Sequence, residues 1–146
     1  MKKSILIILN LAIMTACGSS TATVTPATTS QITMKVDGVL WTGAASGLMV
    51  DSGTLVVDGI NGAASETLGI IIGQVTAPGT FKVKARTGNT MIYSQKGAVI
   101  YDGFNDGQVI VTAINTVSGK QVPSGTFTGT FTNSSGKKYI ITEGKF

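Results

Sequence analysis

The sequence has 146 residues and contains no histidine. This absence excludes a Ser-His-Asp or Cys-His catalytic arrangement and the histidine-rich zinc sites. It also removes the side chain best suited to proton transfer near neutral pH. Carboxylate chemistry, an activated lysine and a cation held by oxygen ligands are the options that remain. We therefore expect a protein that is not an enzyme and has no cofactor, and we assign no catalytic, cofactor-binding or metal-binding residue.

The sequence also contains only one cysteine and has a small net charge. Cys17 is the only cysteine, so the chain after it has no disulfide, no thiolate metal site and no cysteine nucleophile. The formal net charge is +4, and removal of Lys2 and Lys3 with a leader would leave nine basic and seven acidic residues, or +2. That bias is too weak to indicate nucleic acid as a partner.

The N-terminus has the features of a cleaved leader. Lys2 and Lys3 precede an apolar run over residues 5–13, and small residues follow before Cys17. A basic start, a short apolar stretch and small residues at the cut are typical of a secretory signal peptide. The run is shorter than the roughly 20 residues that a membrane-spanning helix needs. We predict that residues 1–16 are a signal peptide, whose removal leaves 130 residues.

The segment Met14-Thr15-Ala16-Cys17-Gly18 resembles the lipobox of bacterial lipoproteins. The resemblance implies cleavage before Cys17, a diacylglycerol on its sulfur and an acyl chain on its new amine.

The residues that follow the cysteine predict a tether. Residues 17–30 are mostly Gly, Ser, Thr and Ala, which cannot bury enough apolar surface to offset the entropy lost on ordering. No acidic cluster of the kind that directs surface export follows Cys17. We therefore expect attachment through the lipid to the periplasmic face of the outer membrane.

Residues 31–146 indicate a single all-β domain. Ile32, Met34 and Val36 alternate with polar residues, as one buried face of a strand requires, and Asp37-Gly38 is a strong turn signal. No stretch holds a helical spacing of apolar residues over three turns. A two-sheet antiparallel sandwich or a flattened barrel follows, because a sheet of this size must bury its apolar face. Further strands are expected at residues 39–41, 47–50, 54–59, 67–75, 80–86, 90–93, 98–101, 108–115, 125–132 and 138–142.

Four landmarks carry a family resemblance. They are Asp-Gly-x-x-Trp at residues 37–41, Pro-Gly-Thr-Phe at 78–81, Ser-Gly-Thr-Phe at 124–127 and Thr-Glu-Gly-Lys-Phe at 142–146. With them the chain resembles a family of small Bacteroidota lipoproteins grouped as a domain of unknown function. The resemblance supports the β fold and the lipid anchor, and it implies no activity.

Trp41 is the only tryptophan and the first candidate for ligand contact. An exposed indole could stack on a sugar ring or anchor a partner. Tryptophan is largely buried on average, and Trp41 follows two apolar residues after a tight turn. We therefore favour packing in the core.

A basic stripe is the second candidate. Lys82, Lys84 and Arg86 alternate with Val83 and Ala85, so the three cations share one face of a strand. They could meet lipid headgroups, phosphates or an acidic partner. The alternative, which we favour, is a solvated strand face on which charge prevents edge-to-edge pairing.

The acidic residues give no assigned site. Residues 102–107 hold two carboxylates and an amide, but their order does not fit an EF-hand loop, and we predict a plain hairpin loop between strands 98–101 and 108–115. A glycosidase needs two carboxylates about 5 to 9 Å apart, and most acids here lie beside glycine in apparent turns. The acids of the mature chain are Asp37, Asp51, Asp58, Glu66, Asp102, Asp106 and Glu143.

A row of hydroxyls marks the last part of the chain. Thr126, Thr128 and Thr130 alternate with Phe127 and Phe131, and Thr132 continues the row. We expect the phenylalanines in the core and the threonines on a solvent-facing surface.

The function expected from all this is a lipid-anchored binding or accessory module of the cell envelope. Its partners would be the membrane, through the lipid on Cys17, and an envelope protein or glycan. A carboxylate-based glycan hydrolase is the alternative, and a structural or adhesin component is a further one.

Overall fold

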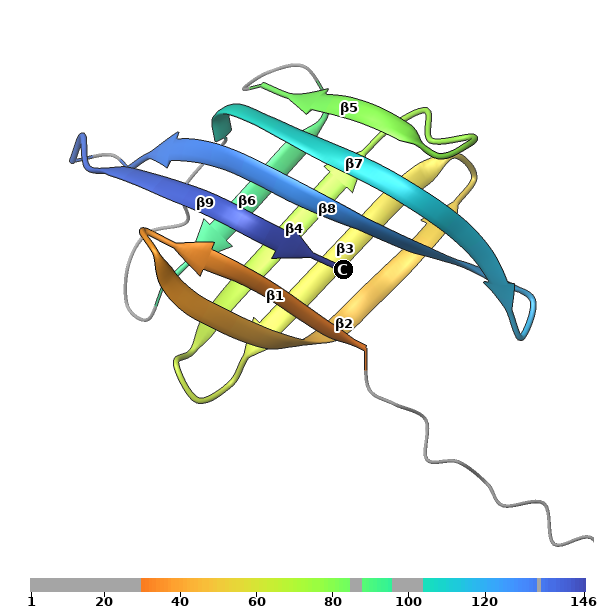
Figure 1. Cartoon of the computed structure of the whole chain (residues 1–146), viewed down its shortest axis with the longest axis horizontal. Helices are drawn as coiled ribbons and strands as arrows, with labels where there is room; N and C mark the ends of the chain where they lie inside the picture. The colour runs from red at the N-terminus through yellow and green to blue at the C-terminus, as the bar shows by residue number, and fades with distance from the viewer. Residues whose placement is uncertain (1–29, 85–87, 96–103, 134) are drawn as a thin grey trace, which may run out of the picture.

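A computed structural model describes residues 30–84, 88–95, 104–133 and 135–146. These residues form nine strands and no helix (Figure 1). The described part therefore contains no helix that is long and apolar enough to cross a membrane. The strands are β1 (Gln31–Val36), β2 (Val39–Asp51), β3 (Thr54–Asn61), β4 (Glu66–Ile72), β5 (Gly79–Val83), β6 (Thr90–Ser94), β7 (Phe104–Val117), β8 (Lys120–Thr132) and β9 (Lys138–Lys145).

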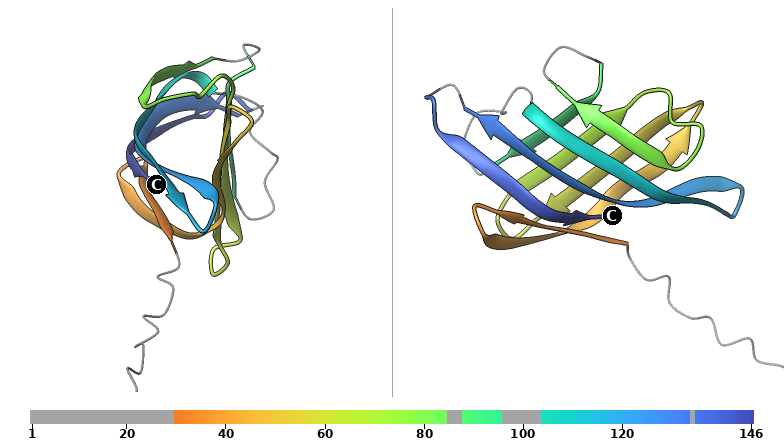
Figure 2. Two further views of the ribbon diagram at one scale, coloured as in Figure 1. Left: turned by 90° about the vertical axis from the view of Figure 1, so that its right-hand side faces the viewer. Right: turned by 45° about the horizontal axis from the view of Figure 1, so that its top comes forward.

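All nine strands belong to one antiparallel sheet, in the order β5-β7-β8-β9-β1-β2-β3-β4-β6. The sheet folds over on itself, so β5, β7, β8, β9 and β1 face β3, β4 and β6 across the core (Figures 1 and 2). A further pairing, Val50 with Gln121, joins β2 to β8 and closes a small barrel that the other strands extend. The expected all-β sandwich or flattened barrel is confirmed.

Strand β2 makes the corner between the two layers. Residues 39–44 pair with β1 and residues 44–51 pair with β3, with a register shift between Ala45 and Gly47. A bulge of this kind adds a residue to one strand and bends it. The prediction of two separate short strands at 39–41 and 47–50 was wrong, because one bent strand serves both layers.

Three two-residue turns set the register of the hairpins. Asp37-Gly38, Ser52-Gly53 and Ser118-Gly119 all have positive φ at both positions, between 47° and 81°. These are the dihedral signs of a type I′ turn, whose twist matches that of the two flanking strands. The predicted Asp37-Gly38 turn is confirmed.

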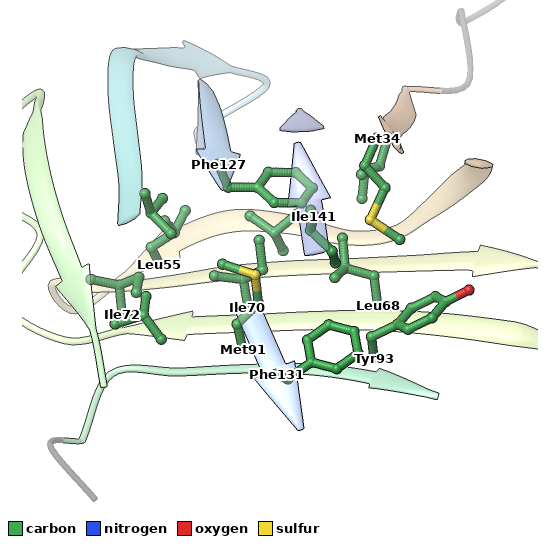
Figure 3. Close-up of a cluster of buried hydrophobic side chains, with 14 of the residues drawn as sticks. Met34, Leu55, Leu68, Ile70, Ile72, Met91, Tyr93, Phe127, Phe131 and Ile141 are labelled. Atoms are coloured by element: carbon green, nitrogen blue, oxygen red, sulfur yellow. The ribbon is translucent and has the colours of Figure 1, made fainter. Parts of the chain in front are cut away.

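The core lies between the two layers, and its residues follow the period-two alternation. Ile32, Met34 and Val36 are buried as predicted, and so are Phe127 and Phe131. Phe127 and Ile141 project from one layer toward Leu68, Ile70 and Met91 of the other (Figure 3).

Three further strand predictions were wrong in part. The strand expected at residues 67–75 ends at Ile72, and the strand expected at residues 80–86 ends at Val83. Residues 104–107 belong to β7 rather than to a hairpin loop, because the long strand β8 offers them backbone partners. A register shift between Phe104 and Asp106 accommodates the turn-favouring residue between them. The predicted strand at 98–101 lies outside the described residues.

Candidate functional site

A pocket of about 260 Å³ opens at the end of the domain where β1 turns into β2. Strand β1 runs toward this end, so its first residue, Gln31, lies at the opposite end of the domain (Figure 1). We call this cavity the end pocket. It is lined by Val36, Asp37, Val39, Leu40, Trp41, Glu66, Tyr93, Gln95, Lys137 and Tyr139.

Trp41 forms the inner wall of the end pocket and is only 3% exposed. Its indole lies over two glycines on neighbouring strands, Gly43 and Gly59. A Cβ at Gly43 would overlap the ring, and one at Gly59 would lie 3.1 Å from it. The expected core position of Trp41 is confirmed, and the glycines provide the space for its ring.

The indole N–H of Trp41 is buried and has no hydrogen-bond partner among the described residues. Leaving such a donor unsatisfied costs roughly 1–3 kcal/mol, so buried donors are nearly always paired. Trp41 lines the end pocket, but its N–H is itself buried, so an acceptor placed there would reach this donor only if the pocket wall shifted.

Two tyrosines and a lysine continue the wall. Tyr93 and Tyr139 both contact the ring of Phe131, with centroids 5.7 and 5.4 Å apart. The Nζ of Lys137 lies 4.5 Å from the centroid of the Tyr139 ring, within the range of a cation–π contact. The Tyr93 hydroxyl points away from the core cluster (Figure 3). The pocket thus combines aromatic rings, hydroxyls and one cation.

One protein-family model matches most of the chain. The family described as a domain of unknown function (DUF6252) matches residues 28–146, which include all nine strands and the end pocket. The chain belongs to this family. No curated protein and no solved structure matches the chain.

Two acidic residues of the DUF6252 domain line the end pocket. Asp37 and Glu66 both line it, although they are far apart in the sequence. One carboxylate oxygen of Asp37 accepts a hydrogen bond from the backbone N–H of Ile140 at 2.8 Å, so this side chain ties the first hairpin to β9. No cluster of three or more potential metal-binding residues occurs in the part of the chain that the structure describes.

The other acids lie elsewhere in the DUF6252 domain. Glu143 pairs with Lys35 at 2.7 Å on the surface. Asp58 lies on the outer face of β3 between Gly47 and Gly69 of the adjacent strands, and desolvation by burial raises its pKa above 3.8. Asp51 and Asp106 line two other hollows, and Asp102 falls outside the described residues.

The basic stripe of the DUF6252 domain lies away from Trp41. Lys82 and Lys84 are exposed on the outer face of the layer that contains β5, and Arg86 lies outside the described residues. Strand β5 stands at one end of the sheet order and ends at Val83, so of the three predicted cations only Lys82 lies within a described strand.

Both lysines line a hollow of about 560 Å³ on that outer face, which we call the outer groove. The structure thus separates the predicted contact residues into two sites. The outer groove is lined by Lys82, Lys84, Asp106, Gly107, Gln108, Thr128, Gly129, Thr130, Ile140, Ile141 and Thr142.

Most residues of both sites carry no local signal in the sequence. Tyr93, Glu66 and Lys137 join Trp41 only through the folding of the sheet, and no local motif marks them. The one available signal was the lone tryptophan with a glycine two residues later, which places both on the same face of a strand.

Proposed function

We propose that this protein is a lipid-anchored binding module of the cell envelope and that the end pocket is its ligand site. The buried, unpartnered N–H of Trp41 is the observation that carries the binding role. Cys17 supports the anchor, because it follows a basic and apolar leader and small residues. The proposed location is the periplasmic face of the outer membrane.

The position of the end pocket suits an anchored domain. The chain enters the domain at Gln31, and the end pocket lies at the far end of β1. Residues 17–30 would link the lipid on Cys17 to this entry point. The pocket would then face away from the point of attachment, where a ligand can reach it without crossing the membrane surface.

The lining indicates the chemistry of the ligand. An acceptor such as a carbonyl or hydroxyl oxygen would receive the Trp41 N–H, and the rings of Tyr93 and Tyr139 would cover an apolar part of the ligand. The volume of 260 Å³ is just below the roughly 300–1,000 Å³ of typical ligand pockets. The pocket therefore suits one sugar ring or one short peptide unit rather than a large cofactor.

Calorimetric titration of the full-length protein in neutral detergent tests this proposal. N-acetylglucosamine and the dipeptide Ala-Ala represent the sugar and peptide chemistry of a bacterial cell wall. We expect saturable binding of one of them, and we expect Trp41→Phe to weaken it because phenylalanine keeps an aromatic ring and loses the N–H. The matched control is Phe81→Tyr, which alters a half-buried aromatic residue outside the pocket lining. No saturable heat with either probe would contradict the choice of ligand chemistry.

A glycan hydrolase is the second candidate, because Asp37 and Glu66 line the same pocket. The hydrogen bond from Ile140 to Asp37 argues against it, since that carboxylate already has a structural role. Chromatography of a chitohexaose incubation would decide, because hydrolysis produces shorter sugars and binding does not. Product that disappears in Glu66→Gln would favour the hydrolase over the binding module.

A further inference from the structure

Charge is unevenly divided between the two outer faces of the domain. In the described residues of β3, β4 and β6, Asp58 is the only charged side chain that points outward. Among the described residues, the opposite face carries six outward lysines and two acids, a formal charge of +4. These lysines are Lys35, Lys82, Lys84, Lys120, Lys138 and Lys145, and the acids are Asp106 and Glu143.

The ion pair between Lys35 and Glu143 neutralises one charge of each sign. Lys82, Lys120, Lys138 and Lys145 of that face are exposed. The weak net charge of the whole chain therefore hides a basic face, whose potential is felt locally within about a Debye length.

The outer groove lies in this basic face and is rich in hydrogen-bonding groups. The register places Lys82 beside Gln108 and Gln108 beside Thr128, so the three side chains form a row across β5, β7 and β8. Asp106 lies beside Thr130 in the parallel row. Ammonium, amide, hydroxyl and carboxylate groups thus share one hollow of about 560 Å³.

We propose that the outer groove binds an anionic glycan chain. Lys82 and Lys84 would contact its carboxylate or phosphate groups, while Gln108 and Thr128 would hydrogen-bond its sugar hydroxyls. Exposed Ile140 offers the apolar surface on which a sugar ring can rest. This site is separate from the end pocket and does not depend on the function proposed for it.

The composition favours a glycan over an anionic membrane surface. A membrane presents a broad layer of phosphates, which a flat basic patch meets through electrostatics alone. The outer groove is hollow and contains Asp106, which a uniformly anionic surface would repel. A sugar chain supplies hydroxyls that can donate hydrogen bonds to this carboxylate.

Binding assays on the full-length protein in neutral detergent test the proposal. The probes are hexagalacturonate, phosphorylated maltohexaose and neutral maltohexaose, together with phosphatidylcholine vesicles with and without phosphatidylglycerol. We expect one of the two anionic glycans to bind, which identifies the anion, and maltohexaose to bind much more weakly. Tighter binding to phosphatidylglycerol vesicles than to either anionic glycan would overturn the proposal in favour of a membrane surface.

Variants locate the binding. The double variant Lys82→Gln/Lys84→Gln should weaken binding of the anionic glycan by about 2- to 30-fold, as expected for two exposed charge contacts. The matched control Lys120→Gln/Lys145→Gln makes the same charge change outside the outer groove and the end pocket, and it should leave affinity within about 2-fold.

Asp106→Asn provides an independent test. It should tighten binding of the anionic glycan, because a like charge is removed, and it should not tighten binding of maltohexaose. Equal losses in both double variants, or an unchanged affinity in Asp106→Asn, would contradict a specific site in the groove. Failure of all glycan probes would overturn this inference and leave the end pocket, which has its own probes, untouched.

Discussion

The contact between Trp41 and Gly43 supports the sharpest stability prediction. A Cβ at Gly43 would overlap the indole ring, so Gly43→Ala forces the ring or the strand to move. Overpacking of this kind costs about 1–3 kcal/mol. Alanine gains about 0.5–1 kcal/mol over glycine inside a strand. The net result should be a loss of about 0.5–2 kcal/mol in the free energy of unfolding.

Urea denaturation measures this loss, and the fluorescence of the single tryptophan reports whether the ring has moved. Gly62→Ala is the matched control, because its added Cβ meets nothing within 4 Å and Gly62 lacks a positive φ. In a Trp41→Leu background the cost of Gly43→Ala should shrink, since the ring that it displaces is gone. A Gly43→Ala variant as stable as wild type, with unchanged emission, would refute the packing argument.

Two further predictions concern the core and the titration of a carboxylate. Phe127 is 1% exposed, so Phe127→Ala should lower the free energy of unfolding by about 3–5 kcal/mol in urea, whereas exposed Thr128→Ala should stay within about 0.5 kcal/mol. Burial raises the folded-state pKa of Asp58 above 3.8, so the folded protein holds this proton more tightly than the unfolded chain. Stability should therefore fall as pH rises from 3.8 through the folded-state pKa, and Asp58→Asn should reduce this slope; identical slopes for both proteins would contradict the burial of Asp58.

The local features of the fold could be predicted from the sequence. Period-two alternation placed Ile32, Met34 and Val36 on the buried face of β1, and it also placed Phe127 and Phe131 in the core. Such patterns succeed because neighbouring residues of a strand point to opposite faces whatever the rest of the fold does.

The long-range features could not be predicted in this way. Strand β2 bends between its two partners, β1 and β3, which lie in different layers. The sequence of β2 alone does not reveal this bend. Residues 104–107 have turn chemistry, yet pairing with β8 extends β7 through them. Tertiary pairing overrides local preference at such positions.

Only some residues of the candidate sites could be predicted from the sequence, for the same reason. Trp41 stood out as the lone tryptophan, but Glu66, Tyr93 and Lys137 reach it through strand order alone. The basic stripe was visible, whereas its setting in the outer groove depends on Gln108 and the threonines of β8. Composition understated the charge of that face, because it averages over both faces of the sheet.

The indole N–H resonance of Trp41 tests the central claim most directly. As the only tryptophan, Trp41 gives a single indole signal in a ¹⁵N–¹H spectrum of the isotope-labelled protein. Titration with N-acetylglucosamine or Ala-Ala should move this signal saturably as the N–H gains an acceptor. A signal that stays fixed at saturating concentrations of whichever probe binds would show that the end pocket does not use this donor, and it would contradict the account.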